Sequence, residues 1–133
     1  MRLGIVIATG LLASATIAEE KLGSFDGVYR QVADADCARI GEEGGALKVE
    51  DDIFIGVGSQ CTMASPVSVR DMNAVLYDME CEAEDAHWVE RVLFMKAADS
   101  GLIMVWNGYA FKYDNCSAED LAAGAVDDVV SNE

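Results

Sequence analysis

The chain has 133 residues, and its 24 acidic and 9 basic side chains give it a formal net charge of −15. A surface this negative repels nucleic-acid phosphates and anionic lipid head groups, which excludes nucleic acid as a partner and favours partners that are neutral or cationic. The same charge also fits a simpler interpretation, in which it only keeps the protein soluble.

The N-terminus has the order of a secretory signal peptide: a base, an apolar run and small residues before a cleavage site. The apolar run covers Leu3–Ala13, and Thr16 and Ala18 occupy the −3 and −1 positions of the site. The run is shorter than the roughly 20 apolar residues of a membrane-spanning helix, and no run of that length follows. We therefore expect residues 1–18 to be removed, and residues 19–133 to form one periplasmic or secreted domain that is not inserted in a membrane.

Short strands separated by turns are predicted along the rest of the chain. Alternating apolar and polar residues, or runs of branched and aromatic residues, predict strands over residues 25–32, 46–50, 53–57, 73–81, 88–95, 102–106 and 109–114. Asn107-Gly108 is a strong signal for a type I′ hairpin between the last two strands. The only proline, Pro66, is expected in a loop over residues 64–66, where it breaks no hydrogen-bond ladder.

Two stretches are predicted to be helical rather than extended. Residues 34–41 are expected to form one or two helical turns that bridge the first two strands. Ser117 is a suitable N-cap, Asp120 follows three residues later and Gly124 is a stop signal, so a short C-terminal helix is expected there. The tail over residues 127–133 is expected to be frayed.

Together these elements predict a mostly β fold: a small antiparallel meander that closes into a barrel, with one short bridging helical segment and a short C-terminal helix. Twist accumulates across seven strands and open edges invite aggregation, so the sheet is expected to curl. The strands at 25–32 and 109–114 run antiparallel in this scheme, and their pairing would close the barrel. Alternation in one strand predicts four residues that face the core: Val75, Tyr77, Met79 and Cys81.

All four cysteines follow the predicted signal peptide, at Cys37, Cys61, Cys81 and Cys116. An even number of cysteines in a small exported domain predicts two disulfides. Their gaps of 24, 20 and 35 residues do not match the paired spacing of zinc ligands. The sequence leaves three connectivities open, and a flat drawing of the meander favours Cys61–Cys116 with Cys37–Cys81.

A resemblance to known proteins covers most of the chain after the signal peptide. It rests on the order of these residues: Gly27-Val28-Tyr29, Cys37, Leu47-x-Val49 followed by Ile53-x-Ile55-Gly56, Cys61, and Tyr113-x-x-Cys116. In this order they look like small exported bacterial proteins of unassigned function, some of whose barrel-shaped members resemble periplasmic lysozyme inhibitors. The resemblance implies a small exported barrel, and it brings no inhibitory motif that matches residues of this chain.

No catalytic, cofactor-binding or metal-binding motif stands out. The single histidine, His87, has no serine in a nucleophile motif to activate. Asp34-x-Asp36 opens like a calcium loop, but Ala38 and Arg39 follow where a ligand and a glycine belong. Several methionines fall in strand patterns, where methionine ordinarily fills gaps in the core rather than binding copper. We therefore expect no cofactor and no metal.

A non-catalytic binding protein is the favoured function, with a cationic protein or a small ligand as its partner. The candidate binding surface is an acidic strand and turn with an aromatic anchor: Asp78, Glu80, Glu82, Glu84, Asp85 and Trp88. In the alternative interpretation of these residues, Trp88 belongs to the core and the acids only solvate a strand. Two other classes stay open, namely a structural or stress-related envelope protein without a discrete site, and a hydrolase with unrecognised carboxylates.

Overall fold

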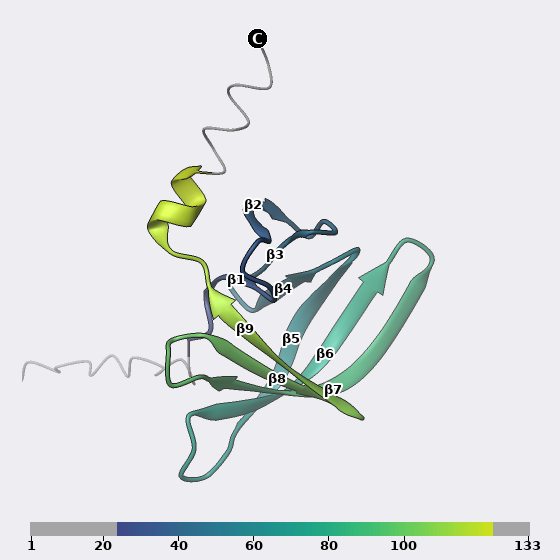
Figure 1. Cartoon of the computed structure of the whole chain (residues 1–133). Helices are drawn as coiled ribbons and strands as arrows, with labels where there is room; N and C mark the ends of the chain where they lie inside the picture. The colour runs from purple at the N-terminus through teal and green to yellow at the C-terminus, as the bar shows by residue number, and fades with distance from the viewer. Residues whose placement is uncertain (1–23, 124–133) are drawn as a thin grey trace, which may run out of the picture.

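The computed structural model describes residues 24–123, and nine strands and one short helix make up this part of the chain (Figure 1). The strands are β1 (Gly27–Arg30), β2 (Asp36–Ile40), β3 (Gly45–Glu50), β4 (Ile53–Gly56), β5 (Ser59–Ser68), β6 (Ala74–Ala83), β7 (Ala86–Lys96), β8 (Leu102–Trp106) and β9 (Tyr109–Asn115). The helix covers residues 118–123. The expected signal peptide, the stop at Gly124 and the tail from residue 127 lie outside the described residues.

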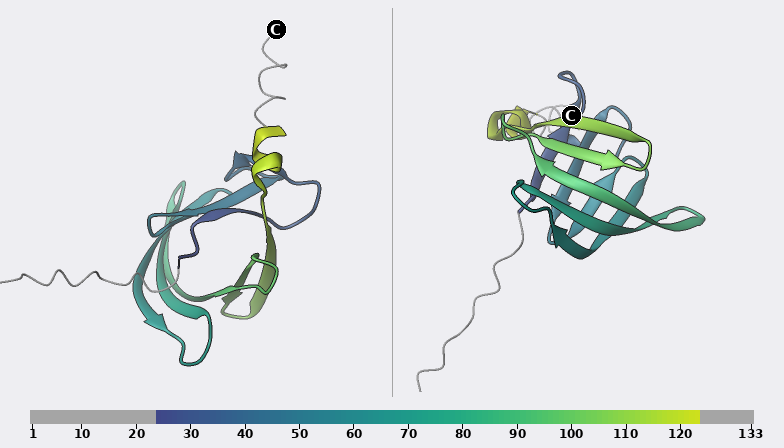
Figure 2. Two further views of the ribbon diagram at one scale, coloured as in Figure 1. Left: turned by 90° about the vertical axis from the view of Figure 1, so that its left-hand side faces the viewer. Right: turned by 90° about the horizontal axis from the view of Figure 1, so that it is seen from below.

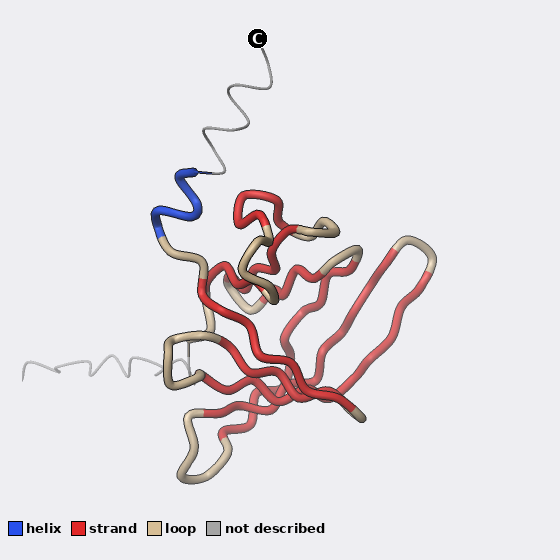
Figure 3. The backbone as a smooth tube through the Cα atoms, in the orientation of Figure 1, coloured by secondary structure: helices blue, strands red, loops and turns tan. Residues whose placement is uncertain are grey.

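Eight of the strands form a closed antiparallel barrel, which confirms the predicted fold class. Consecutive strands from β3 to β9 pair antiparallel, and β1 closes the ring by pairing with both β9 and β3. Tyr29 of β1 lies opposite Asn115 on one side and Leu47 on the other. The curled sheet is visible as a ring in Figure 2, and Figure 3 marks how much of the chain is extended. Closure of the ring pairs strand edges that would otherwise be free.

The bridging helix expected over residues 34–41 is wrong, because this segment contains β2, an extra strand that runs parallel to β3. The backbone of this segment makes hydrogen bonds to a neighbouring segment rather than the internal hydrogen bonds of a helix. For example, the N–H of Asp36 donates to the carbonyl of Gly44 at 3.0 Å. Gly45 permits this close approach, since a Cβ there would lie only 1.9 Å from the carbonyl oxygen of Arg39. Pairing with the next strand therefore outweighs the local helical tendency, which is weak for so short a segment.

The loop predicted around Pro66 is also wrong, because this proline lies within β5. The register of β5 against β6 shifts between Ala64 and Val67, which leaves Ser65 and Pro66 opposite Tyr77 alone. This two-against-one arrangement is a β-bulge, and Ser65 has a φ of 52° there. A bulge takes residues out of the hydrogen-bond ladder, so a proline without an N–H is tolerated at that point.

One end of the barrel is filled by a hydrophobic core. The four residues of β6 that were predicted to face inward are all buried: Val75, Tyr77, Met79 and Cys81. Phe25 packs edge-on against the rings of Tyr77 and Phe94, with centroids 6.3 Å and 5.6 Å apart. Edge-to-face aromatic pairs contribute about 0.5–1.5 kcal/mol each beyond the burial of their surface. The segment before β1 is thereby anchored to the middle of the sheet.

The hairpin predicted at Asn107-Gly108 is confirmed, but the expected turn type is wrong. β8 and β9 pair directly across the two residues, yet only Gly108 has a positive φ, 106°. A type I′ turn requires a positive φ at both central residues. That pattern occurs instead between β3 and β4, where Asp51 and Asp52 have φ values of 50° and 61°. Aspartate tolerates this region better than most residues, because its short side chain can bond locally.

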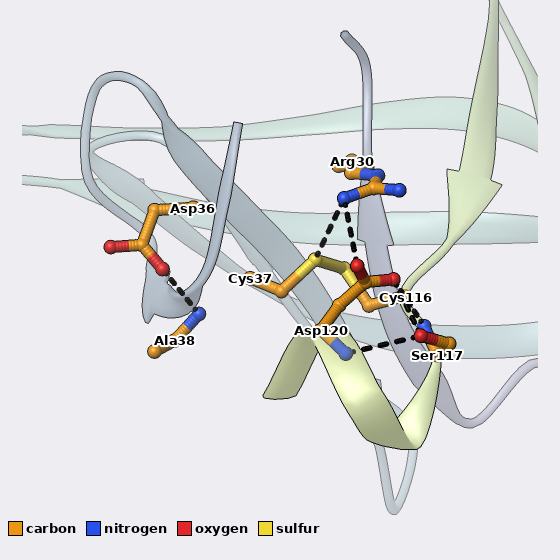
Figure 4. Close-up of a disulfide and its surroundings, with 7 residues drawn as sticks. All are labelled: Arg30, Asp36, Cys37, Ala38, Cys116, Ser117 and Asp120. Carbon is orange, nitrogen blue, oxygen red and sulfur yellow. Dashed lines mark hydrogen bonds and ion pairs between the residues drawn. A yellow bond between two sulfur atoms is a disulfide. The ribbon is translucent and has the colours of Figure 1, made fainter. Parts of the chain in front are cut away.

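Both predicted disulfides form, but the expected pairing is wrong: Cys61 bonds to Cys81, and Cys37 bonds to Cys116. Cys61 and Cys81 are register partners on β5 and β6. Cys37 on β2 has its Cα 6.1 Å from that of Cys116, just beyond β9 (Figure 4). The flat drawing fails because it ignores the stagger of barrel strands and the extra strand β2. Two disulfides are consistent with an exported protein.

The C-terminal helix begins as predicted, with Ser117 as its N-cap. The backbone N–H of Asp120 donates to Oγ of Ser117 at 3.1 Å, and the backbone N–H of Ser117 donates to Oδ2 of Asp120 at 2.9 Å. The hydroxyl of Ser117 also bonds to this carboxylate and lowers the pKa of Asp120 below its usual value. Nη1 of Arg30 lies 3.4 Å from Asp120 and 3.9 Å from Sγ of Cys37, so it connects the helix to the disulfide (Figure 4).

Candidate functional site

The barrel is hollow at the end opposite Phe25, where a cavity of about 250 Å³ opens to solvent. Six strands contribute to its wall, namely β1, β3, β4, β5, β8 and β9. The wall is dominated by aromatic side chains: Tyr29, Phe54, Trp106, Phe111 and Tyr113. Val57 and Ser59 lie at the β4–β5 turn on the rim. We call this feature the barrel mouth.

The far side of the cavity is closed by hydrogen bonds as well as by packing. The hydroxyl of Tyr29 donates to the carbonyl oxygen of Phe25 at 2.7 Å. Nζ of Lys96 donates to the same hydroxyl at 3.1 Å and lies 6.0 Å from the centre of the Phe25 ring. The hydroxyl of Tyr29 therefore uses its donor and one acceptor position in bonds to the protein itself.

The aromatic wall follows from the alternation of side chains along β8 and β9. Leu102 and Met104 are fully buried, so Trp106, two residues further along β8, points to the same inner face. On β9, Tyr113 lies opposite Leu102 and Phe111 lies opposite Met104. The result is two inward-facing rows on neighbouring strands, in which Trp106 of β8 and Phe111 and Tyr113 of β9 bring their rings to the cavity.

Ring contacts hold this wall together, one between β4 and β8 and one along β9. The Phe54 and Trp106 rings are 6.3 Å apart and nearly edge-to-face, and the Phe111 and Tyr113 rings are 6.1 Å apart. Rings have few rotatable bonds, so they form a wall that loses little side-chain entropy when a ligand contacts it. The mouth is therefore a preformed apolar surface that is continuous with the hydrophobic core.

The electrostatic character of the cavity differs sharply from that of the whole protein. Among residues 24–123, no Asp, Glu, Lys, Arg or His side chain lines the cavity. Burial raises the pKa of the Tyr113 hydroxyl above its usual value. This hydroxyl is therefore a neutral hydrogen-bond donor at physiological pH. The mouth offers apolar rings and hydroxyl or amide groups, but no ionised group.

The acidic residues singled out from the sequence lie elsewhere, on the β6–β7 hairpin that projects past the barrel rim (Figures 1 and 2). Glu80 and Glu82 line a shallow surface groove of about 420 Å³ together with Trp88, which is 37% exposed. Asp78 is bound to Arg91 instead, with Oδ1 2.9 Å from the guanidinium. Glu84 lies in a second groove beside the first. The structure therefore brings Glu80, Glu82 and Trp88 together, but not the whole predicted set, which also includes Asp85.

His87 lines both grooves, between Glu82 and the β6–β7 turn. Ser59 shares the second groove with it, but no hydrogen bond joins their side chains within residues 24–123. In the same residues no group of three or more His, Cys, Asp or Glu side chains is placed to hold a metal ion. No helix in this part of the chain is long and apolar enough to cross a membrane.

The aromatic residues of the mouth were not predicted as a site from the sequence. A signal was present: Trp106, Phe111 and Tyr113 alternate with exposed residues on two strands joined by a two-residue turn, which places them on one face. Alternation alone does not distinguish a filled barrel interior from a hollow one, so this pattern by itself does not identify a site.

Comparison of the chain with protein-family models, with curated proteins and with solved structures finds no match.

Proposed function

We propose that this protein is an exported, non-catalytic binding protein that holds a small apolar ligand in the barrel mouth. The observation that carries the proposal is the cavity of about 250 Å³ lined by five aromatic rings. An eight-stranded barrel has an interior just wide enough to be filled by side chains or to hold one small ligand. Binding pockets for small molecules are typically concave, mostly apolar and largely preformed, with a few polar groups.

The proposal also includes export of the protein from the cytoplasm. It rests on the predicted signal peptide at residues 1–18 and on two disulfides, which persist mainly in oxidising compartments such as the bacterial periplasm. Intact-mass measurement of the protein recovered after export tests it. The expected mass is that of a chain beginning at Glu19 with all four cysteines oxidised. A retained N-terminus, or alkylation without prior reduction, would contradict it.

Ligand binding can be measured with the protein's own fluorescence, because the chain has two tryptophans and one of them lines the mouth. Replacing the remote one, Trp88→Phe, leaves Trp106 as the only reporter. We expect small neutral aromatic probes such as acetophenone to change Trp106 emission in a saturable way.

A blocking variant and a matched control sharpen this test. Leu47→Phe adds a ring to a buried wall position of the cavity and is expected to abolish saturable binding. Val105→Phe makes a comparable addition at an exposed position of β8 and should leave binding unchanged. Equal binding in both variants would place the probe outside the mouth and overturn the proposal.

A second candidate function is binding of a cationic protein, with a lysozyme-like enzyme as the sharpest example. The observation in its favour is the groove on the β6–β7 hairpin, where Glu80 and Glu82 flank Val89, an apolar side chain that is 69% exposed. Exposed apolar surface rimmed by charge is typical of protein interaction sites. Opposite charge would speed the encounter and make it sensitive to salt.

The test of this second function is titration of the oxidised protein with a cationic lysozyme at low and moderate salt. Glu80→Gln with Glu82→Gln should weaken binding at the groove. Glu43→Gln with Glu119→Gln removes the same charge from exposed positions elsewhere and should weaken it much less. Equal losses of lysozyme affinity in the two double variants would mean that the binding is only nonspecific charge attraction.

A further inference from the structure

We propose that the ligand of the barrel mouth is an uncharged molecule of about one substituted ring, with a hydrogen-bond acceptor that binds the Tyr113 hydroxyl. This inference rests on the proposed ligand-binding function and specifies the chemistry of the ligand.

Tyr113 is the polar anchor because its hydroxyl has no partner in the described part of the chain. The side chain is only 9% exposed and lines the cavity, and no side-chain hydrogen bond is found for it within residues 24–123. The hydroxyl oxygen is open to the cavity, since Nε of Arg30 is the only fully buried side-chain nitrogen or oxygen without a partner within residues 24–123. A molecule that enters the mouth can therefore meet this hydroxyl, with water as its partner when no ligand is bound.

Tyr29 provides the internal comparison. It is also buried and also lines the cavity, but its hydroxyl donates to Phe25 and accepts from Lys96. Its hydrogen-bonding capacity is used by the protein itself. Of these two buried tyrosines in the wall, only Tyr113 is left to meet a ligand.

The charge of the ligand follows from what the wall lacks. An anion would meet no lysine, arginine or histidine in the cavity lining and would approach a protein with a net charge of −15. A cation would find no carboxylate there. Moving an unpaired charge out of water is costly, and these walls offer no pairing in return. The ligand is therefore neutral.

The size of the ligand follows from the volume. The cavity measures about 250 Å³. An apolar cavity of about 150 Å³ is known to hold benzene in another protein, so this one has room for a ring with a short substituent. Such a ring would meet the rings of Trp106, Phe111 and Phe54 in the wall by stacking or edge contacts.

Four probes that share a phenyl ring test these points on the Trp88→Phe background, with Trp106 emission as the readout. Acetophenone is neutral and carries an acceptor, ethylbenzene is its apolar counterpart, benzoate is an anion, and benzyltrimethylammonium is a cation. We expect acetophenone to bind about 3- to 10-fold more tightly than ethylbenzene, the range of one net hydrogen bond. We expect the two charged probes to bind more weakly than either neutral one.

Two variants assign the preference to Tyr113. Tyr113→Phe removes only the hydroxyl and should bring acetophenone down to the affinity of ethylbenzene, while leaving ethylbenzene unchanged. Tyr109→Phe is the matched control, since Tyr109 lies on the same strand, is 59% exposed and is outside the cavity lining. It should keep the wild-type preference. Circular dichroism of each variant establishes that it is folded.

The outcomes separate this inference from the function on which it rests. Equal binding of acetophenone and ethylbenzene by the wild type would overturn the anchor role of Tyr113 but leave the apolar mouth intact. Tight binding of benzoate or of the ammonium probe would overturn the inferred neutrality. Failure of all four probes to bind would overturn ligand binding at the mouth itself.

Discussion

Cys61 and Cys81 lie directly opposite each other on β5 and β6, with Cα atoms 4.0 Å apart, and are joined by a disulfide inside the hydrophobic core. This bridge links neighbouring strands that are only 20 residues apart in the chain. The other bridge, between Cys37 and Cys116, spans 79 residues and attaches β2 to the end of β9. The two disulfides therefore stabilise different parts of the molecule.

Removing Cys37–Cys116 is expected to release β2 and the C-terminal helix while the barrel persists. β2 is not one of the eight strands of the ring, so the ring can stay closed without it. In a Cys37→Ala/Cys116→Ala variant we expect stability to fall by about 2–4 kcal/mol and amide exchange to rise mainly in β2 and the helix. A Cys61→Ala/Cys81→Ala variant should instead raise exchange throughout β5 and β6. Identical exchange patterns in the two variants would contradict this division.

Gly108→Ala is expected to destabilise the protein by about 1–2 kcal/mol, because residue 108 has a φ of 106° that L residues rarely adopt. No atom lies within 4 Å of the added Cβ, so the cost comes from the backbone alone. Asn107→Ala should cost much less, since residue 107 does not have a positive φ. Urea denaturation of both variants measures the difference. Equal losses would mean that the turn is of type I′ after all.

Gly45→Ala is expected to detach β2 from β3. Its Cβ would lie 1.9 Å from the carbonyl oxygen of Arg39, and that backbone atom cannot move without breaking the strand pairing. The expected loss is about 1–3 kcal/mol, as for other overpacked sites. Gly44→Ala, with a φ of 76° and open space around it, should cost about 1 kcal/mol through the backbone only. Thermal unfolding of the pair, with amide exchange in β2, checks this; intact protection of β2 in Gly45→Ala would refute it.

Tyr77 and Tyr113 are expected to make the protein less stable above about pH 10. Burial raises the pKa of both hydroxyls above the usual tyrosine value, and the nearby Asp52 and Asp26 raise that of Tyr77 further. The folded state therefore holds these protons more tightly than the unfolded state. This contribution is fully present below about pH 10 and is lost as the pH rises through the raised pKa values.

The measurement for this pH dependence is the free energy of unfolding between pH 7 and about 11.5. The free energy of unfolding of Tyr113→Phe should fall less steeply with pH than that of the wild type, because this variant lacks one hydroxyl whose pKa is raised in the folded state. Tyr109→Phe, at an exposed position, should follow the wild-type curve. A decline of the same slope in all three proteins would show that the buried tyrosines do not control it.

The amino-acid sequence by itself determined the mostly β fold, the inward face of β6, the closure of the first strand against the last, and the Ser117 cap. The inward face of β6 and the Ser117 cap depend on patterns within a few residues, whereas closure followed from the number and direction of the predicted strands. Alternation with period two fixes which side chains of a strand face the core, and a cap needs only residues three positions apart. Val75, Tyr77 and Met79 could therefore be placed without knowledge of their partners.

Only the tertiary structure decided the disulfide partners, the strand β2, the bulge at Pro66 and the hollow mouth. The Cys61–Cys81 pairing and the hollow mouth depend on how far one strand slides past the next when the sheet closes, and this stagger is a property of the whole ring. The strand β2 lies outside the ring and depends on its pairing with β3. The stagger sets Cys61 opposite Cys81, and it determines whether Trp106 and Tyr113 meet side chains or empty space across the barrel. Alternation in the sequence identifies the residues that point inward, but the volume they enclose exists only once all eight strands are joined.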